Sequence, residues 1–325
     1  MGNFPSDRLV YGMQLPVQSQ SVIYAEPWEA GAGAGELLAV ARAADEGGFG
    51  YLACCEHVAI PERLADAMST VWYDPVATLG FLAAATSHVR LLSHVAVVGL
   101  RHPLASAKQY ATLDHLSGGR LILGVGAGHV REEFDALGAD FDARGPVLDE
   151  TIEALKVALG EDEFPAFEGE RFSFSGLGQR PRPAQTPRPP LWVGGSSGPA
   201  VRRAALRADG WLPQGDPRDA LPERIARIRR LREEAGLAGE PFTVGAITEP
   251  LYVGEPAWDV GRRTLTGPPE ALAKSLAAYA EMGVHQIQVR FRSRSVTELL
   301  DQIRAFSGEV APLLPPVPGG AGREG

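Results

Sequence analysis

Leu191-Trp192-Val193-Gly194-Gly195-Ser196-Ser197-Gly198 is a short apolar run that ends in glycines and hydroxyl residues, and a helical pattern over Pro199–Ala208 follows it directly. The stretch predicts one strand–turn–helix unit. Glycine lets the backbone approach a ligand closely, and the serines add hydrogen-bond donors. The start of the helix adds unpaired N–H groups and the positive end of its dipole. The turn therefore predicts a site for a phosphate-bearing ligand, with an ordinary strand-to-helix turn as the alternative.

The same alternation of strand and helix extends along almost the whole chain. The predicted strands are Val10–Leu15, Gly50–Cys54, Arg90–Val98, Arg120–Val125, Pro190–Val193, Gly210–Pro213, Phe242–Ile247 and His285–Phe291. The predicted helices are Glu36–Gly47, Pro75–Ser87, Pro103–Leu116, Pro146–Leu159, Pro199–Ala208, Pro217–Ala235, Pro268–Met282 and Val296–Val310. Eight strands that alternate with eight helices predict an α/β fold, the (β/α)8 or TIM barrel.

The place of the glycine turn favours the closed barrel over a doubly wound open sheet. An open sheet more often carries a glycine-rich turn after its first strand. Here the first predicted strand leads into Gln14–Ser21, which contains no glycine. We therefore predict the barrel, with the glycine turn after its fifth strand.

Two segments depart from the alternation. Residues 161–189 contain two aromatic fragments and a proline-rich run, which predict a small hairpin and an extended crossing inserted before the fifth strand. Residues 313–325 are rich in proline and glycine without a core pattern, so a disordered tail is expected there. A single domain is expected over residues 1–312.

Composition and charge narrow the classes of partner. The net charge of −9 argues against binding to nucleic acid or to an anionic membrane, which requires cations over a wide face. Residues 171–207 nevertheless hold seven arginines and neither lysine nor acidic residue, which fits a small anionic ligand. No signal peptide and no transmembrane stretch is expected. The adjacent Cys54 and Cys55 predict no disulfide and a reducing, cytoplasmic location.

Candidate groups for proton transfer follow two predicted strands. Glu56 and His57 come directly after the second strand, and His129 follows the fourth, beside Gly126 and Gly128. Since the active sites of (β/α)8 barrels lie at the carboxyl ends of the strands, we expect these residues on one rim. An imidazole can pass a proton near pH 7, as transfer of a hydride with a proton requires. Two alternatives stay open: Glu56 holds His57 for structure alone, or the two glycines are the ligand contacts.

Other residues carry weaker indications. His94 lies within the apolar run Leu91–Leu100, a position typical of a hydrogen-bonded core histidine. The histidines and carboxylates show no paired ligand spacing such as H-E-x-x-H, so no metal site is expected.

Three segments taken together resemble the luciferase-like monooxygenase superfamily. They are Arg101-His102-Pro103-Leu104, the stretch Thr112–Leu121 with Gly124–Gly128, and Pro190–Gly195. The later pieces Ala208–Trp211 and Gly267–Glu270 agree in order and spacing, so the resemblance runs from about Val10 to Pro312. It implies a TIM barrel that binds either reduced FMN or the deazaflavin coenzyme F420. The proline-rich approach to the glycine turn and the compact length are similar to the F420-dependent branch.

The resemblance also implies roles for individual residues. His57 matches the histidine near the reactive carbon of the deazaflavin, and Glu56 stands where that branch often has Asp. His129 matches a position that varies among relatives. The positions that match the bulge with a non-prolyl cis peptide behind the cofactor ring are Ser93, His94 and Val95. The glycine and hydroxyl positions implied to bind the cofactor are Gly126, Gly128, Gly194, Gly195, Ser196 and Ser197. The arginines that could hold an anionic cofactor tail are Arg180, Arg182, Arg188 and Arg202.

The activity implied by the resemblance is that of an oxidoreductase. Hydride would pass between C5 of the deazaflavin and a small organic substrate, while His57 passes the proton. The substrate would contact residues 14–24, 60–73 and 211–214, and a homodimer is expected at the family level. An FMN-dependent monooxygenase is the first alternative. A non-catalytic barrel that binds a flavin or a phosphate ligand is the second.

Overall fold

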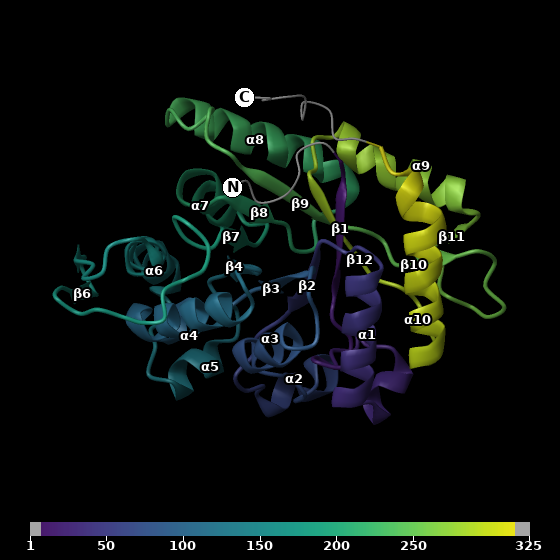
Figure 1. The fold of residues 1–325 in the computed structure, drawn as a ribbon, viewed down its shortest axis with the longest axis horizontal. Helices are drawn as coiled ribbons and strands as arrows, with labels where there is room; N and C mark the ends of the chain where they lie inside the picture. The colour runs from purple at the N-terminus through teal and green to yellow at the C-terminus, as the bar shows by residue number, and fades with distance from the viewer. Residues whose placement is uncertain (1–7, 316–325) are drawn as a thin grey trace.

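Eight parallel strands form the centre of the computed structural model, which describes residues 8–315 (Figure 1). These strands are β1 (Val10–Gln14), β2 (Tyr51–Cys54), β3 (Arg90–Ser93), β4 (Leu121–Val125), β7 (Leu191–Gly194), β8 (Gly210–Leu212), β9 (Thr243–Ile247) and β12 (Gln286–Val289). They close into a barrel in the order β1-β12-β9-β8-β7-β4-β3-β2. The predicted fold class is confirmed. Residues 1–7, on which the expected absence of a signal peptide depends, and residues 316–325 of the tail expected at 313–325 lie outside the described part of the chain; Leu313 ends a 3-10 helix.

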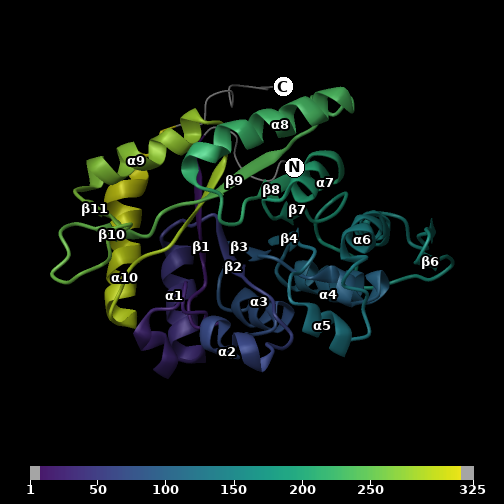
Figure 2. The same cartoon turned by 180° about the vertical axis from the view of Figure 1, so that it is seen from behind.

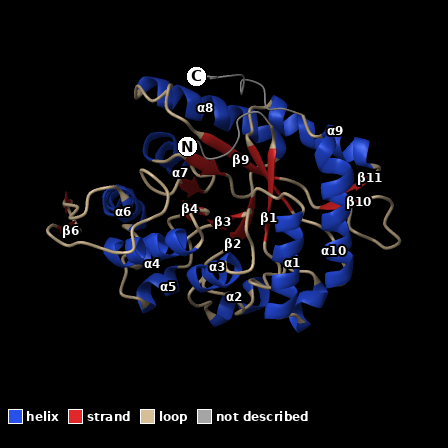
Figure 3. Ribbon diagram, viewed as in Figure 1, coloured by secondary structure: helices blue, strands red, loops and turns tan. Residues whose placement is uncertain are grey.

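Helices surround the barrel on its outer face, as Figure 3 shows with the strands in red and the helices in blue. The helices that follow the strands are α1 (Ala34–Glu46), α3 (Pro75–Ala83), α4 (Pro103–Leu116), α6 (Arg144–Leu159), α7 (Gly198–Arg207), α8 (Leu221–Glu234), α9 (Pro269–Glu281) and α10 (Val296–Ala305). Each overlaps a predicted helix. In α1, Leu37, Val40, Ala41 and Ala44 are buried, because residues at this spacing share one face of a helix. None of the helices within residues 8–315 combines the length and apolar character needed to cross a lipid bilayer.

Several short elements lie outside the predicted set. They are the 3-10 helix η1 (Pro27–Gly31), α2 (Glu62–Met68), α5 (Arg131–Ala136) and the parallel pair β10 (Leu251–Val253) and β11 (Leu265–Gly267). Helix α2 buries none of its residues, so it has no apolar face for periodicity to detect. Helices α2 and α5 both lie at the lower end of the molecule, in Figure 1 and in the opposite view of Figure 2.

The predicted strand Arg90–Val98 is longer than the strand that forms. Strand β3 ends at Ser93, and pairing with β4 resumes only at an isolated bridge between Ala96 and Val125. The apolar character of this run continues through the interruption, so composition alone could not reveal where the strand ends. The interruption coincides with the bulge implied by the resemblance.

The barrel interior is filled by side chains and is not a pore. Its buried cluster contains Tyr51, Ala53, Leu92, Ile122, Trp192 and Leu212. The rings of Tyr51 and Trp192 meet edge to face with centroids 6.3 Å apart. Because the interior is packed, the described strands leave no space for a ligand inside the barrel, and the ends of the strands are where a site can form.

The inserted segment before β7 is a small hairpin followed by an extended crossing, as predicted. Strands β5 (Phe167–Glu168) and β6 (Ser173–Phe174) pair antiparallel. The crossing is fixed to α4 by the buried carboxylate of Asp114, which accepts the backbone N–H groups of Ala184 at 2.8 Å and Gln185 at 3.0 Å. The same carboxylate accepts the Gln185 side-chain amide at 2.7 Å and the Leu121 N–H at 3.2 Å. One buried side chain therefore joins the insertion, α4 and β4.

Candidate active site at the barrel mouth

His57 is held by a carboxylate from another βα loop. Its Nδ1 lies 2.8 Å from Oε2 of Glu133, which stands in the first turn of α5. The other oxygen of Glu133 accepts the N–H groups of Val58 at 2.7 Å and Ala59 at 3.2 Å. The loop after β2 is therefore tied to the loop after β4 through one buried carboxylate. This answers the alternative in which Glu56 would hold His57: the partner is Glu133.

The electrostatics of this pair define which nitrogen can exchange a proton. Burial raises the pKa of Glu133, but the hydrogen bond and charge of His57 and the two backbone N–H groups outweigh it and leave that pKa below its ordinary value. The carboxylate is thus ionised at neutral pH and can only accept, so Nδ1 of His57 carries the hydrogen. Its Nε2 is then the nitrogen that can accept a proton.

His57 is also packed by rings that border the mouth. The ring of Trp72 lies edge to face at 4.5 Å between centroids, and that of His129 at 5.2 Å. Burial, followed by the charge of His57, lowers the pKa of His129, against a smaller opposing effect of Glu133. His129 is therefore neutral at pH 7. The two histidines predicted on one rim lie next to each other.

Glu56 faces the loop after β3. One of its carboxylate oxygens accepts the Val97 N–H at 2.6 Å, and the other pairs with Arg101. Both oxygens of this buried side chain are therefore engaged by the segment that follows the bulge. The contacts of Glu56 position that segment, and none of them reaches His57.

At the bulge after β3, three of the predicted cofactor-binding residues lie together: Val95, Gly126 and Gly194. The peptide bond between His94 and Val95 is cis. A Cβ atom added to either Gly126 or Gly194 would overlap the methyl groups of Val95. The ends of β3, β4 and β7 thus meet at Val95, where Gly126, directly after β4, and Gly194, the last residue of β7, leave room for its side chain. Next to it, the Ser93 hydroxyl contacts the N–H of Gly124 at 3.0 Å and its carbonyl at 2.9 Å.

His94 is buried beside the glycine turn. Burial lowers its pKa to about 4, against the opposing effect of a hydrogen bond with Gln288, so it is neutral at pH 7. Its Nε2 lies 3.4 Å from the side-chain nitrogen of Gln214. The hydroxyl of Ser196 accepts the Gln214 N–H at 2.8 Å and donates to the Gln214 carbonyl at 2.9 Å. Gln214 therefore connects the bulge with the glycine turn, a link that sequence reasoning missed.

The turn itself has the form of an anion site. Gly195 has a φ of +112°, a backbone conformation that favours glycine. Ser197 is the N-cap of α7, and its exposed side chain accepts the Ala200 N–H at 3.3 Å. The Ser196 hydroxyl is occupied by Gln214, Pro199 has no N–H, and the N–H groups of Ala200 and Val201 are bonded to Ser197. The donor that the first turn of α7 offers to a ligand is therefore the Gly198 N–H, at the positive end of the helix dipole. This donor set fits a phosphate group, which FMN and F420 both carry.

Gly128 differs from the other predicted glycine contacts. It has a φ of +77°, and a side chain there would collide with Phe134 and Val97. The requirement for glycine at this position comes from the packing of α5 against the bulge.

Most of the arginines of residues 171–207 form ion pairs and do not leave an unpaired positive charge for the glycine turn. Four of them pair with acidic residues from other parts of the chain, in the ion pairs Arg180–Glu163, Arg188–Asp209, Arg203–Asp149 and Arg207–Glu153. Arg202 is exposed on the outer face of α7, in a hollow shared with Ala235 and Leu237. The local count suggested an unpaired basic cluster because it could not include carboxylates that folding brings in from elsewhere.

Comparisons with known proteins agree with this architecture. A family model described as luciferase-like monooxygenase matches residues 11–260. An uncharacterized protein of Mycobacterium tuberculosis is 32% identical over 259 residues, which cover 75% of this chain and 90% of that protein. A second uncharacterized protein of that species is 39% identical over 167 residues, 51% of this chain and 56% of the relative. The chain therefore spans little more than half the length of that second relative.

Solved structures share the fold at low sequence identity. A monooxygenase from Streptomyces bottropensis has a TM-score of 0.76 at 23% identity, covering 94% of this chain and 99% of the other. An F420-dependent secondary alcohol dehydrogenase in complex with an F420-acetone adduct has a TM-score of 0.75 at 16% identity, with the same coverage. A riboflavin lyase with modified FMN and riboflavin has a TM-score of 0.77 at 16% identity, covering 94% and 91%.

Proposed function

The chain belongs to the luciferase-like monooxygenase family, and we propose that within this family it is an F420-dependent oxidoreductase acting on a small organic substrate. The observation that carries the proposal is the His57–Glu133 pair, which lies at the barrel mouth with Nδ1 and Oε2 2.8 Å apart. A fixed imidazole suits a reaction in which hydride and proton move separately. The fold is shared with F420-dependent enzymes and with flavin enzymes, so the family leaves both cofactors open.

Different residues of the barrel mouth would bind different parts of the cofactor. The Gly198 N–H and the positive dipole end at the start of α7, with Gly194, Gly195 and Ser197, would hold the phosphate. The bulge at His94 and Val95 would lie behind the ring. When bound, F420 supplies the hydride carrier, at its C5 carbon.

The proton is assigned to His57. In the direction of substrate reduction, Nε2 donates a proton to the substrate oxygen as hydride arrives at carbon; in the direction of oxidation, Nε2 accepts it. The Glu133 carboxylate orients the ring and keeps Nδ1 protonated in both directions. Trp72 and His129 limit the movement of the ring. The oxygens of Glu56 are engaged with Val97 and Arg101, so we assign this residue to holding the bulge.

The first prediction concerns cofactor choice. In a fluorescence titration of the purified protein, F420 is expected to bind at least about tenfold more tightly than FMN, a difference of about 1.4 kcal/mol. Gly194→Ala is expected to weaken cofactor binding by a similar factor, because the new methyl group displaces Val95. Gly80→Ala is the matched control, since nothing lies within 4 Å of a Cβ at that helical position.

The outcomes of this titration separate the candidate functions. Preferential binding of FMN would reassign the chain to the flavin monooxygenases. Binding of neither cofactor would leave a barrel without redox activity and end the proposal.

The second prediction tests Glu133 as the residue that positions His57. Glu133→Gln is expected to lower kcat by about 100-fold or more with little change in cofactor affinity. If the amide oxygen keeps the Val58 and Ala59 N–H bonds, the amide NH2 faces Nδ1, which must then give up its hydrogen. The wrong tautomer places the hydrogen on Nε2. Steady-state kinetics measures the loss.

A spectroscopic readout distinguishes positioning from general structural support. The wild-type protein should show a downfield proton resonance from His57 Nδ1–H, and Glu133→Gln should lack it. Glu132→Gln is the control, because Glu132 is exposed and pairs with Arg63. A Glu133→Gln enzyme with wild-type kcat would remove Glu133 from the mechanism.

A further inference from the structure

One side of the barrel mouth is left free by the cofactor site proposed above. In the closed strand order, β7, which carries the glycine turn, stands opposite β1 with three strands between them on either side. The bulge follows β3 and His57 follows β2, so the proposed cofactor extends from β7 toward these strands. The carboxyl ends of β1 and β12 remain for a substrate.

A small pocket lies at these two strand ends. It has a volume of about 30 Å³ and lies among Gln14, Ser19, Tyr24, Glu26, Glu29 and Arg290. Met13, Leu15, Pro16, Phe291 and Leu299 add apolar walls. A single water requires about 10–15 Å³ of such space, so the pocket accommodates about two oxygen-sized groups.

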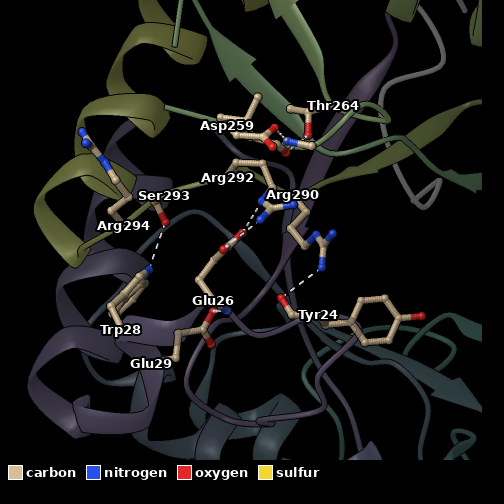
Figure 4. Close-up of polar contacts among 12 residues, drawn as sticks. Tyr24, Glu26, Trp28, Glu29, Asp259, Thr264, Arg290, Arg292, Ser293 and Arg294 are labelled. Carbon is tan, nitrogen blue, oxygen red and sulfur yellow. Dashed lines mark hydrogen bonds and ion pairs between the residues drawn. The ribbon is translucent and has the colours of Figure 1, made fainter. Parts of the chain in front are cut away.

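The two carboxylates beside the pocket are already engaged by the protein. Glu29 accepts the Val17 N–H at 2.7 Å and the Glu26 N–H at 2.8 Å, one on each oxygen. Val17 is β-branched and has a φ of +69°, so the Glu29 hydrogen bond stabilises a strained turn. Glu26 forms an ion pair with Nε of Arg292 at 2.5 Å. Figure 4 shows this pair between Glu29 and Arg290.

Arg290 has no such carboxylate partner within residues 8–315. Its Nη1 donates to the carbonyls of Ile23 at 2.8 Å and Tyr24 at 3.0 Å, which fixes the side chain against the loop after β1 (Figure 4). Burial lowers the pKa of Arg290, and the charges of Glu26 and Glu29 oppose this effect. The remaining donors of the guanidinium are Nε and Nη2.

Ser19 provides a second donor without a protein acceptor. Its residue is only 4% exposed, and its hydroxyl has no hydrogen-bond partner in the described part of the chain. A buried hydroxyl that lacks a partner costs free energy unless a ligand or water satisfies it. The pocket therefore combines a cation and a hydroxyl donor, in a space for two oxygens.

We propose that Arg290 and Ser19 bind a carboxylate group of the substrate, so that the enzyme acts on a small organic acid. The claim that the bound acid is the substrate rests on the proposed function, whereas the claim that the pocket binds a carboxylate does not. A planar carboxylate matches both the guanidinium and the two-oxygen volume. Ser19 forms a backbone bridge with Trp72, and the ring of Trp72 packs against His57, so the carbon chain would leave the pocket toward His57.

The test uses hexanoate and its neutral analogue hexanamide as probes. Ligand-detected NMR on the full chain, without cofactor, should give an affinity for hexanoate at least about tenfold higher than for hexanamide. Arg290→Gln should abolish this difference, Arg290→Lys should retain part of it, and Ser19→Ala should weaken hexanoate severalfold. Arg294→Gln is the matched control, because Arg294 lies four residues away and pairs with Glu298 at the surface.

Each other outcome has a definite meaning. Equal affinities for the two probes in the wild-type protein, or an unchanged preference in Arg290→Gln with an unaltered melting temperature, would overturn the assignment. If Arg290→Gln does not fold, Arg290→Lys and Ser19→Ala decide the question. The carboxylate bound in the pocket could belong to the substrate or to the tail of F420, and a parallel F420 titration distinguishes the two. A loss of F420 affinity in Arg290→Gln would show that the pocket binds the cofactor tail and would refute the substrate assignment. Failure of the wild-type protein to bind F420 would refute the proposed function and leave the carboxylate site standing.

Discussion

Replacement of His57 by alanine is expected to lower turnover by about 10²–10⁴-fold while cofactor affinity stays within about threefold. The imidazole is the group at the mouth with a proton-accepting nitrogen fixed in place, since Nδ1 is held by Glu133 at 2.8 Å. The cofactor contacts proposed at the bulge and the glycine turn do not involve His57. Steady-state kinetics together with the F420 fluorescence titration measure the two effects separately.

Matched variants make the His57 experiment specific. His88→Ala should behave as the wild type, because the His88 side chain is 84% exposed in the turn before β3. His57→Gln keeps a hydrogen-bonding side chain but not a titratable one, and should lose as much turnover as the alanine variant. Wild-type turnover in both His57 variants would show that another group transfers the proton.

Replacement of Asp114 by alanine is expected to lower the free energy of unfolding by about 3–5 kcal/mol. The Asp114 residue is fully buried, and its carboxylate accepts four N–H groups, from Ala184, Gln185 and Leu121. Without it, the buried Leu121 N–H and the partly buried donors of Gln185 lose their acceptor at the junction of α4, β4 and the insertion. Urea denaturation followed by circular dichroism measures the change.

Two further variants bracket the Asp114 effect. Asp114→Asn retains one acceptor oxygen and should lose about half as much stability. Asp142→Ala removes an exposed, solvent-screened partner of Arg131 and should leave the stability almost unchanged. An Asp114→Ala protein as stable as the Asp142→Ala protein would mean that the insertion is held by other contacts.

The barrel was predictable because its signals are local. Each predicted strand overlaps one of the eight barrel strands, since a short apolar run followed by an amphipathic helix repeats along the chain. The elements that prediction missed are those without a local signal. Helix α2 buries no residue, and the end of β3 lies within a continuous apolar run.

The candidate site was predictable only in part. Its strand-end residues His57 and His129, its glycines and its bulge follow from the fold and the resemblance. Glu133 was missed, although one signal for it exists: Val130, Glu133 and Phe134 share one face of a helical turn, which places a carboxylate on an apolar face. All three are buried.

The sequence by itself determined the alternation that closes the barrel and the family to which the chain belongs, because periodicity and short motifs depend on neighbouring residues. Only the tertiary structure decided the electrostatics. His57 and Glu133 are 76 residues apart in the chain yet in hydrogen-bond contact, while Arg188 and Arg203, on either side of the glycine turn, are paired with carboxylates from other segments. Charges act through space, so their partners are fixed by the closed barrel and not by their order along the chain.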